Sequence, residues 1–363
     1  MSKPRILFIM HMPPPVHGAS VMGGQLRDSA RIREAFETEY LNLSSSASLD
    51  EIGKGLLRKV SFVIRLLRQV RQVLREWKPD LVYVTPTSTL PALAKDYLMV
   101  RLVRRYRCRI ALHFHNKGVA ARSGRWLDDW VYRHLFDGAE VILLSDLLRP
   151  DVDRYVPSER ISICANGLDL PVEVSRNYHR DTPRLLFLSN LLPDKGIVDL
   201  LDACSLLQGR GYSFTCRFVG APTPALSSED FRRMVTDRGL DDLVSYDGPR
   251  YGQEKQAVWE QADIFVHPTR EDCFPLVVLE AMAAALPVVS THEGGIADEV
   301  EEGVSGLLCE KANPKALADA IACLLTDPAL RERMGQAGRE RYERCFTATC
   351  FERRMLEILR SYV

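Results

Sequence analysis

The stretch EDCFPLVVLEAM (271–282) carries two carboxylates in surroundings where a carboxylate is costly. Glu280 stands inside the apolar run PLVVLEAMAAALPVV, and Asp272 precedes it by eight residues. An unpaired buried charge costs several kcal/mol or becomes protonated, so a partner should compensate Glu280. Because proline favours the first turn of a helix, we expect a helix that begins near Pro275. Glu280 then lies roughly two turns in, with its side chain leaning back toward the helix start.

The residues alone leave two interpretations of this pair open. In the first, Asp272 and Glu280 frame a pocket that accepts hydrogen bonds from several hydroxyl groups, which is what a sugar or a ribose offers. In the second, Asp272 only caps the helix, where the dipole favours its charge, and Glu280 pairs with an arginine.

Two glycine-containing loops also have the residue types of ligand sites. Lys195 and Gly196 precede an expected helix near Ile197, and a lysine beside a helix N-terminus suits a phosphate group; the alternative is a solvated loop lysine. The chain has no GxxxxGK[ST], which argues against a P-loop nucleotidase. Gly18 opens another helix after a proline-rich loop, where it either allows close approach to a ligand or serves as a turn glycine.

His113 and His115 alternate at the end of an apolar strand, so they point to opposite faces. His115 lies nearer the loop and is the candidate for a ligand contact, the alternative being a hydrogen-bonded structural histidine. Asp151 and Asp153 form an Asp-x-Asp in a charged stretch with no phosphate-binding loop beside it. We expect no metal there, and neither a metal nor another cofactor for the chain.

The elements that position these residues form two successive series of strands and helices. Apolar runs typical of strands covered on both faces alternate with helix-like stretches at 52–77, 88–105 and 125–136. The series restarts after the polar segment 172–183, which is the best linker. The expected strands are RILFIM (5–10), DLVYVT (80–85), RIALHF (109–114), EVILLS (140–145), RLLFLS (184–189), FTCRFVG (214–220), LVSYDG (243–248), DIFVHP (263–268) and LPVVST (286–291).

Two such series predict an α/β protein with two doubly wound, Rossmann-like domains facing a central cleft. The length of 363 residues exceeds that of one usual hydrophobic core and agrees with two domains. We expect residues 1–175 to form the first domain and 176–346 the second. Residues 347–363 are expected to form a terminal helix whose docking the sequence does not fix; packing back on the first domain is one arrangement.

Composition excludes several classes of protein. Lysine and arginine together number 48, as do aspartate and glutamate, so no global charge indicates a nucleic-acid partner. The nine cysteines form no CxxC, which favours reduced thiols in a cytoplasmic protein. No run of 18 apolar residues occurs, so no membrane span is expected. The apolar run at the start of the chain is too short for a signal peptide, and we interpret it as a first strand.

Several motifs, in the right order and spacing, resemble those of the family-four retaining glycosyltransferases of the GT-B fold, over nearly the whole chain. They are ANGLD (165–169), LLPDKG (191–196), DCFPLVVLEAMA (272–283), and the Pro-Val-Val, Gly-Gly and Gly-Leu-Leu elements within LPVVSTHEGGIADEVEEGVSGLL (286–308). The resemblance implies transfer of a sugar from a nucleotide-diphosphate sugar to a saccharide hydroxyl, with retention of configuration. It also implies GT-B domains, the first for the acceptor and the second for the donor.

The same resemblance assigns roles to residues. His115, Lys195 and Asp272 would act at the reacting centre, and the donor would be bound by Gly18, Asn190, Lys195, Asp272, Cys273, Phe274, Pro275, Leu276 and Glu280. In these roles Glu280 accepts from the ribose hydroxyls and Lys195 neutralises the leaving diphosphate. Asn190 stands near the place where the family usually has an arginine. Asp272 replaces the commoner glutamate, and with Glu271 adjacent the assignment between these two acids stays open.

The acceptor is expected to be lipid-linked, because the chain looks most like bacterial transferases of capsule, exopolysaccharide and O-antigen synthesis. The basic segments 53–78 and 101–109 have two interpretations: a core-facing helix with solvated arginines, or a peripheral contact with anionic lipid on the inner face of the cytoplasmic membrane. Two alternatives to a transferase stay open. One is a nucleotide-sugar epimerase of the same fold class, and the other is a non-catalytic, sugar-nucleotide-sensing subunit.

Overall fold

The computed structural model describes residues 3–43, 56–170 and 176–363. The chain divides into two compact units, the first comprising Met1–Leu168 with Ala348–Val363 and the second Asp169–Thr347. Each unit contains one six-stranded sheet in which every neighbouring pair of strands is parallel. The predicted fold class, α/β with two Rossmann-like domains, is confirmed.

The first unit is built on a sheet with the strand order β2-β1-β3-β4-β5-β6. Ile6, Leu7 and Phe8 of the central strand are fully buried, as expected for a strand covered on both faces. The strands are β1 (Arg5–Met10), β2 (Glu37–Asn42), β3 (Leu81–Val84), β4 (Arg109–His113), β5 (Glu140–Leu143) and β6 (Ile161–Ile163).

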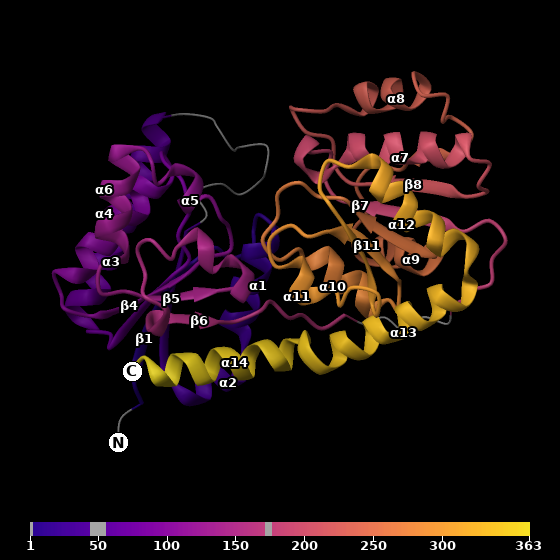
Figure 1. Ribbon diagram of the computed structural model, residues 1–363. Helices are drawn as coiled ribbons and strands as arrows, with labels where there is room; N and C mark the ends of the chain where they lie inside the picture. The colour runs from indigo at the N-terminus through magenta and orange to yellow at the C-terminus, as the bar shows by residue number, and fades with distance from the viewer. Residues whose placement is uncertain (1–2, 44–55, 171–175) are drawn as a thin grey trace. The chain divides into compact units, whose positions relative to one another are not determined.

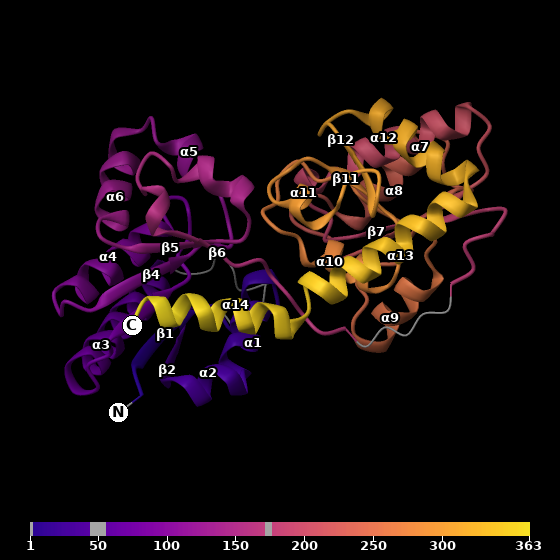
Figure 2. The ribbon, with the colours of Figure 1, turned by 60° about the horizontal axis from the view of Figure 1, so that its bottom comes forward.

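Three helices of the first unit lie side by side on one face of this sheet: α3 (Leu56–Glu76), α4 (Leu93–Arg104) and α6 (Trp126–Phe136) (Figures 1 and 2). The remaining helices are α1 (Gly18–Asp28), α2 (Ala30–Ala35), α5 (Val119–Arg122) and α14 (Ala348–Ser361), with short 3₁₀ turns at Asp146–Asp151 and Ser158–Arg160. The last helix, α14, packs on α2, and Arg31 forms an ion pair with Glu352 at 3.7 Å.

In the sequence, the apolar residues of this segment fall at 56, 60, 63, 67, 70, 74 and 77, a helical stripe that predicts which side of α3 is buried. Val70 and Leu74 are buried as predicted, but Leu66 is buried too, while Val60 is 48% exposed. The buried side is thus turned toward Leu66, and α3 packs on α4. Val60 and Ile64 consequently face solvent.

The second unit has the strand order β12-β11-β10-β7-β8-β9. Its strands are β7 (Arg184–Leu188), β8 (Thr215–Val219), β9 (Val244–Tyr246), β10 (Ile264–His267), β11 (Val288–Thr291) and β12 (Gly306–Cys309). Its helices are α7 (Ile197–Gly209), α8 (Ser228–Thr236), α9 (Gly252–Gln261), α10 (Leu276–Ala283), α11 (Ile296–Glu299), α12 (Pro314–Thr326) and α13 (Pro328–Cys345), with a 3₁₀ turn at Pro193–Lys195. Leu185, Phe187 and Phe218 belong to its core, packed against α7 and α12.

The strand order of the second unit reverses between β7 and β10. From β7 the chain moves outward to β8 and β9, and it then returns to the other side for β10, β11 and β12. Open α/β sheets bind ligands beyond the carboxyl ends of the strands at such a switch point. The loops that follow β7 and β10 are therefore the first place to look for a site.

Candidate functional site

Gly196 joins the two loops at the switch point. It has a φ of 76° and forms the N-cap of α7, and a Cβ there would lie 1.9 Å from the carbonyl oxygen of Pro268. Only glycine therefore fits this close approach. The amide of Arg270 also donates to the carbonyl of Asp194 at 2.7 Å, so the loop after β10 is fastened to the turn that carries Lys195.

Lys195, Asp272 and His267 form a charged cluster at this point. The Lys195 ammonium lies 2.6 Å from Asp272 Oδ2, and His267 Nε2 lies 3.1 Å from the same oxygen. Burial of Asp272 opposes its ionisation, but the hydrogen bonds and charges of His267 and Lys195 outweigh burial and lower its pKa to about 2. The site thus holds a permanent carboxylate with a cation on it.

The geometry distinguishes Asp272 from its neighbour Glu271. Pro275 is the N-cap of α10 and no side chain caps that helix, so the interpretation of Asp272 as a mere helix cap is wrong. Glu271 is exposed, and only its carbonyl oxygen accepts from Lys195, at 3.1 Å. The carboxylate that faces Lys195 and His267 belongs to Asp272.

Glu280 has its partner in the neighbouring helix α9. The Lys255 ammonium lies 2.7 Å from Glu280 Oε1, and the Glu280 side chain is only 12% exposed. A lysine therefore compensates the buried carboxylate, where sequence reasoning considered an arginine. Nothing in the sequence links position 255 to position 280, because the two helices meet only in the folded unit.

The loop after Asp272 is held by the predicted Gly-Gly element. The amide of Gly295 donates to the carbonyl of Cys273 at 2.7 Å. A Cβ on Gly294, which has a φ of 58°, would lie 2.3 Å from the carbonyl oxygen of Asp272. Cys273 and Phe274 are buried, and the Phe274 ring lies 5.8 Å from that of Phe346. This packing fixes the backbone between Asp272 and Leu276, the first residue of α10.

Two further polar residues lie in these loops, Asn190 after β7 and Arg270 after β10. Asn190 is exposed, and its side-chain oxygen accepts from the amide of Ala221 at 3.2 Å, so it braces the loop after β8. Arg270 is held in a two-pronged pair with Asp199, at 2.6 and 2.7 Å. Lys195 is therefore the cation of the β7 loop that stands beside Asp272.

His267 was not among the predicted site residues, although the predicted strand DIFVHP (263–268) ends with it and Pro268. His267 is buried at the end of β10, and its Nδ1 has no partner among the described residues. Because His267 follows an apolar strand directly and precedes Asp272 by five residues, its position was a usable signal.

In the first unit, four imidazoles cluster near the carboxyl ends of β1 and β4: His11, His17, His113 and His115. The rings of His113 and His115 lie 4.2 Å apart, so the prediction that they point to opposite faces is wrong. Burial, with the charges of His11 and His17, lowers the pKa of His115 to about 3, and burial likewise lowers that of His11 to about 4. His113 is instead structural, with its Nδ1 2.5 Å from the Tyr83 hydroxyl. His115 is therefore neutral at physiological pH and available as a hydrogen-bonding group.

Gly18 is the first residue of α1. The preceding residue, His17, caps this helix, since its Nδ1 accepts from the Ser20 amide at 3.3 Å. The Ser20 hydroxyl accepts from the His17 amide at 2.9 Å in return. Among the described residues, no cluster of three or more histidine, cysteine, aspartate or glutamate side chains has the arrangement of a metal site.

Residues 174–341, which carry the cluster of Lys195, Asp272 and His267, match the family model described as Glycosyl transferases group 1. The fold of the whole chain is the GT-B fold of its structural neighbours: HepE of Anabaena, solved in complex with UDP, aligns over 99% of this chain and 100% of that one, with a TM-score of 0.76 and 18% identity.

Curated relatives are also named as glycosyltransferases. A D-inositol 3-phosphate glycosyltransferase of Corynebacterium efficiens is 32% identical over 223 residues, which are 56% of this chain and 52% of the relative. The capsular polysaccharide biosynthesis glycosyltransferase CapM of Staphylococcus aureus is 26% identical over 229 residues, or 59% of each chain. This chain thus spans about half the length of such relatives.

Proposed function

We propose that the chain is a retaining glycosyltransferase that moves a sugar from a nucleotide-diphosphate sugar to a hydroxyl of a saccharide acceptor. The observation that supports this most is the cluster of Lys195, Asp272 and His267 at the topological switch point of a segment that matches the family. It combines a cation for a diphosphate with a carboxylate for sugar hydroxyls.

In this proposal Lys195 stabilises the leaving group. The bond to the anomeric carbon breaks as negative charge develops on the diphosphate, and a preorganised cation lowers that barrier. The N-terminus of α7 begins directly after Lys195 and adds free amides and its dipole. Donor binding exchanges partners: Lys195 turns from Asp272 to the phosphate, and Asp272 then accepts from donor-sugar hydroxyls.

Glu280 is proposed to bind the ribose. The Lys255 ammonium lies 2.7 Å from Glu280 Oε1 and 2.6 Å from Oε2 and holds the carboxylate in place. A carboxylate can accept several hydrogen bonds at once, so Glu280 can accept more beside this pair. A ribose diol supplies such donors. The backbone of Cys273, Phe274, Pro275 and Leu276 is proposed to hold the donor sugar beside Asp272.

In the first unit, Gly18 and His115 are the proposed donor contacts. Gly18 offers the amide end of α1 to a phosphate or sugar, and a neutral His115 offers a hydrogen bond near the reacting centre. Retention is proposed to follow from front-side attack, in which the acceptor hydroxyl approaches from the face that the diphosphate leaves and gives its proton to the departing phosphate oxygen. No metal or other cofactor is part of this proposal.

A lipid-linked saccharide on the cytoplasmic face of the membrane is the proposed acceptor, and surface polysaccharide synthesis the proposed role. Its support is the similarity to CapM and the surface of α3, where Arg65, Arg68 and Arg71 are exposed beside exposed Val60 and Ile64. Basic and apolar residues together suit peripheral contact with anionic lipid. Within the described ranges, no helix is long and apolar enough to cross a membrane.

A donor screen tests the proposal. Uridine, guanosine and adenosine diphosphate sugars are added in a thermal-shift assay, in which a ligand of the folded state raises Tm with its saturation. We expect one nucleotide to raise Tm, and Glu280→Ala to abolish that rise. Turnover then separates the alternatives: an epimerase converts donor without acceptor, and a sensing subunit binds donor without turnover. No shift with any nucleotide would contradict the proposal.

A further inference from the structure

A cavity of about 770 Å³ lies at the edge of the first unit's sheet where its strands begin. Pro4, Asp80 and Arg109 line it, and they stand at the amino ends of β1, β3 and β4. Gly18 and His115 instead follow the carboxyl ends of strands. The cavity is therefore separate from the proposed donor contacts, and its volume lies within the usual range for small-molecule sites.

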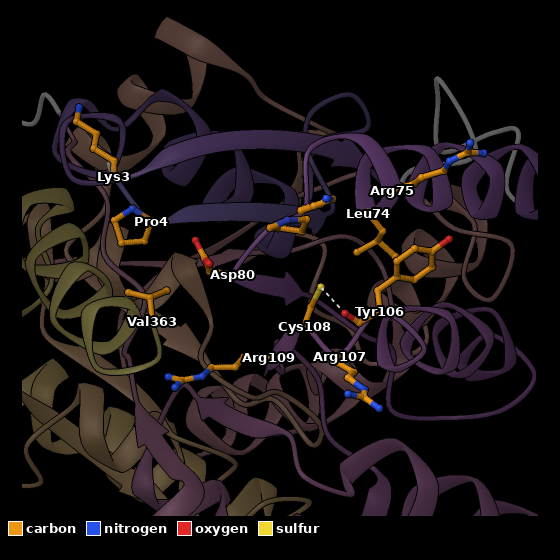
Figure 3. A pocket seen from close by; sticks show the side chains of 12 residues that line it. Lys3, Pro4, Leu74, Arg75, Asp80, Tyr106, Arg107, Cys108, Arg109 and Val363 are labelled. Atoms are coloured by element: carbon orange, nitrogen blue, oxygen red, sulfur yellow. Dashed lines mark hydrogen bonds between the residues drawn. The ribbon is translucent and has the colours of Figure 1, made fainter. Parts of the chain in front are cut away.

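The lining of this cavity is strongly basic. Its cationic side chains come from three segments distant in sequence: Lys3 at the start of the chain, Arg75 and Lys78 at the end of α3, and Arg107 and Arg109 before β4. Figure 3 shows Lys3, Asp80 and Arg109 on one side of the hollow and Arg75, Tyr106 and Arg107 on the other. The two basic segments found in the sequence, 53–78 and 101–109, thus meet at one place.

Most of this positive charge is uncompensated. Asp80 is the one acid among the lining side chains, and its Oδ2 already accepts from the amide of Arg5 at 2.8 Å. Within the described residues, Arg75, Lys78 and Arg107 take part in no ion pair and in no side-chain hydrogen bond. Unpaired cations that share a concave site repel one another and attract an anion.

Two of these cations occupy an unfavourable backbone conformation. Lys78 has a φ of 51° and Arg107 a φ of 58°, each just beyond the end of its helix. Glycine or asparagine is usual at such left-handed positions, because other side chains are strained there. The helix dipole does favour a cation near a helix C-terminus, but it does not require the left-handed residue itself to be lysine or arginine.

We propose that this cavity binds a phosphate-bearing anion with two or more negative charges, held by Arg75, Lys78 and Arg107. A guanidinium group matches the geometry of phosphate oxygens with two parallel hydrogen bonds, and a lysine adds a point charge. The anion is either a free di- or polyphosphate compound or a lipid headgroup that carries a phosphomonoester, since both present the same chemistry. This site is independent of the sugar-transfer reaction.

The test replaces the two strained cations with glycine in the full chain. Lys78→Gly with Arg107→Gly removes two charges while relieving the backbone, so Tm should stay level or rise. Calorimetric titration with pyrophosphate forms one arm, and sedimentation with phosphatidylcholine vesicles containing phosphatidic acid, whose phosphomonoester has two ionisable oxygens, forms the other. Arg105→Ala is the matched control, because Arg105 is exposed and lies outside the cavity, two residues before Arg107.

We expect the double variant to bind at least tenfold more weakly and the control to stay within twofold. Loss in the pyrophosphate arm identifies a free anion as the ligand, and loss in the vesicle arm alone identifies a lipid headgroup. The proposal is overturned if the wild-type chain binds neither ligand, or if the double variant binds like the wild type. Sugar transfer to a soluble acceptor should be unchanged, so this result is separable from a failure of the proposed enzyme function.

Discussion

Lys195 Nζ lies 2.6 Å from Asp272 Oδ2, and this ion pair links the loops after β7 and β10. Both side chains are largely buried, at 21% and 17% exposure, so solvent screens the pair only in part. A buried pair is costly to break on one side only. The relationship therefore predicts effects on stability as well as on activity.

The first prediction concerns acid stability. Asp272 has a pKa lowered to about 2, so its contribution to stability is present above the unfolded-state pKa near 4 and is lost as the pH falls through 2. We expect Asp272→Asn to lose roughly 2 kcal/mol of unfolding free energy at pH 6 and to lose less than the wild type between pH 4 and pH 2. Urea denaturation at several pH values measures this. Asp242→Asn, at an exposed site, is the control, and parallel pH curves for Asp272→Asn and wild type would refute the assignment.

The second prediction concerns Lys255. Lys255→Ala leaves the Glu280 carboxylate buried without its cation, which should destabilise the chain by about 1–3 kcal/mol. Lys315→Ala, which removes an exposed lysine, should change stability by less than about 0.5 kcal/mol. Denaturation midpoints compare the two variants. Equal, small effects would mean that the Lys255–Glu280 contact contributes nothing.

The third prediction concerns Gly196. Ala at this position meets both the strain of a φ of 76° and the carbonyl oxygen of Pro268, whereas Ala at Gly211 meets only the strain of a φ of 80° in open space. Gly211→Ala should cost about 1–2 kcal/mol. Gly196→Ala should cost clearly more and should also weaken donor binding, because Lys195 moves with the loop. Similar losses in both variants would show that the close approach to Pro268 is not needed.

The fourth prediction concerns the protonation state of His115. Since the pKa of His115 is lowered to about 3, its imidazole is neutral from about pH 4 upward in the folded chain. In the unfolded chain the same imidazole takes up a proton near pH 6.5. We expect His115→Asn to keep most activity and His115→Ala to lose it, with the same pH profile for wild type and His115→Asn between pH 5 and 8. A rate inflexion near 6.5 that disappears in His115→Asn would contradict a neutral role.

The sequence predicted the buried parts of the fold well and the edges poorly. Apolar strands such as β1 and β10 were found because burial on both faces requires continuous apolar residues. The strand β2 was missed, since ETEYLN is polar and half-exposed at the sheet edge, and the three-residue β6 was too short to give a pattern. The buried side of α3 differs from the predicted apolar stripe, and the sequence alone does not show that α3 packs against α4.

The candidate site was likewise predicted only in part. Asp272, Glu280 and Lys195 were found because charged residues stand out at strand ends and in apolar helices. Their partners were not: Lys255 lies on another helix, and only folding brings it to Glu280. The Lys195–Asp272 contact joins residues 77 positions apart, a distance over which no local pattern carries information.

The most direct test of the account measures sugar transfer from the nucleotide sugar selected by the donor screen to a lipid-linked saccharide, in wild type, Lys195→Ala and Glu280→Ala. We expect Lys195→Ala to lower kcat by about 10²–10³, as for loss of one preorganised charge-stabilising group. Glu280→Ala should instead mainly raise KM for the donor. Transfer at wild-type rates by both variants would contradict the central claim.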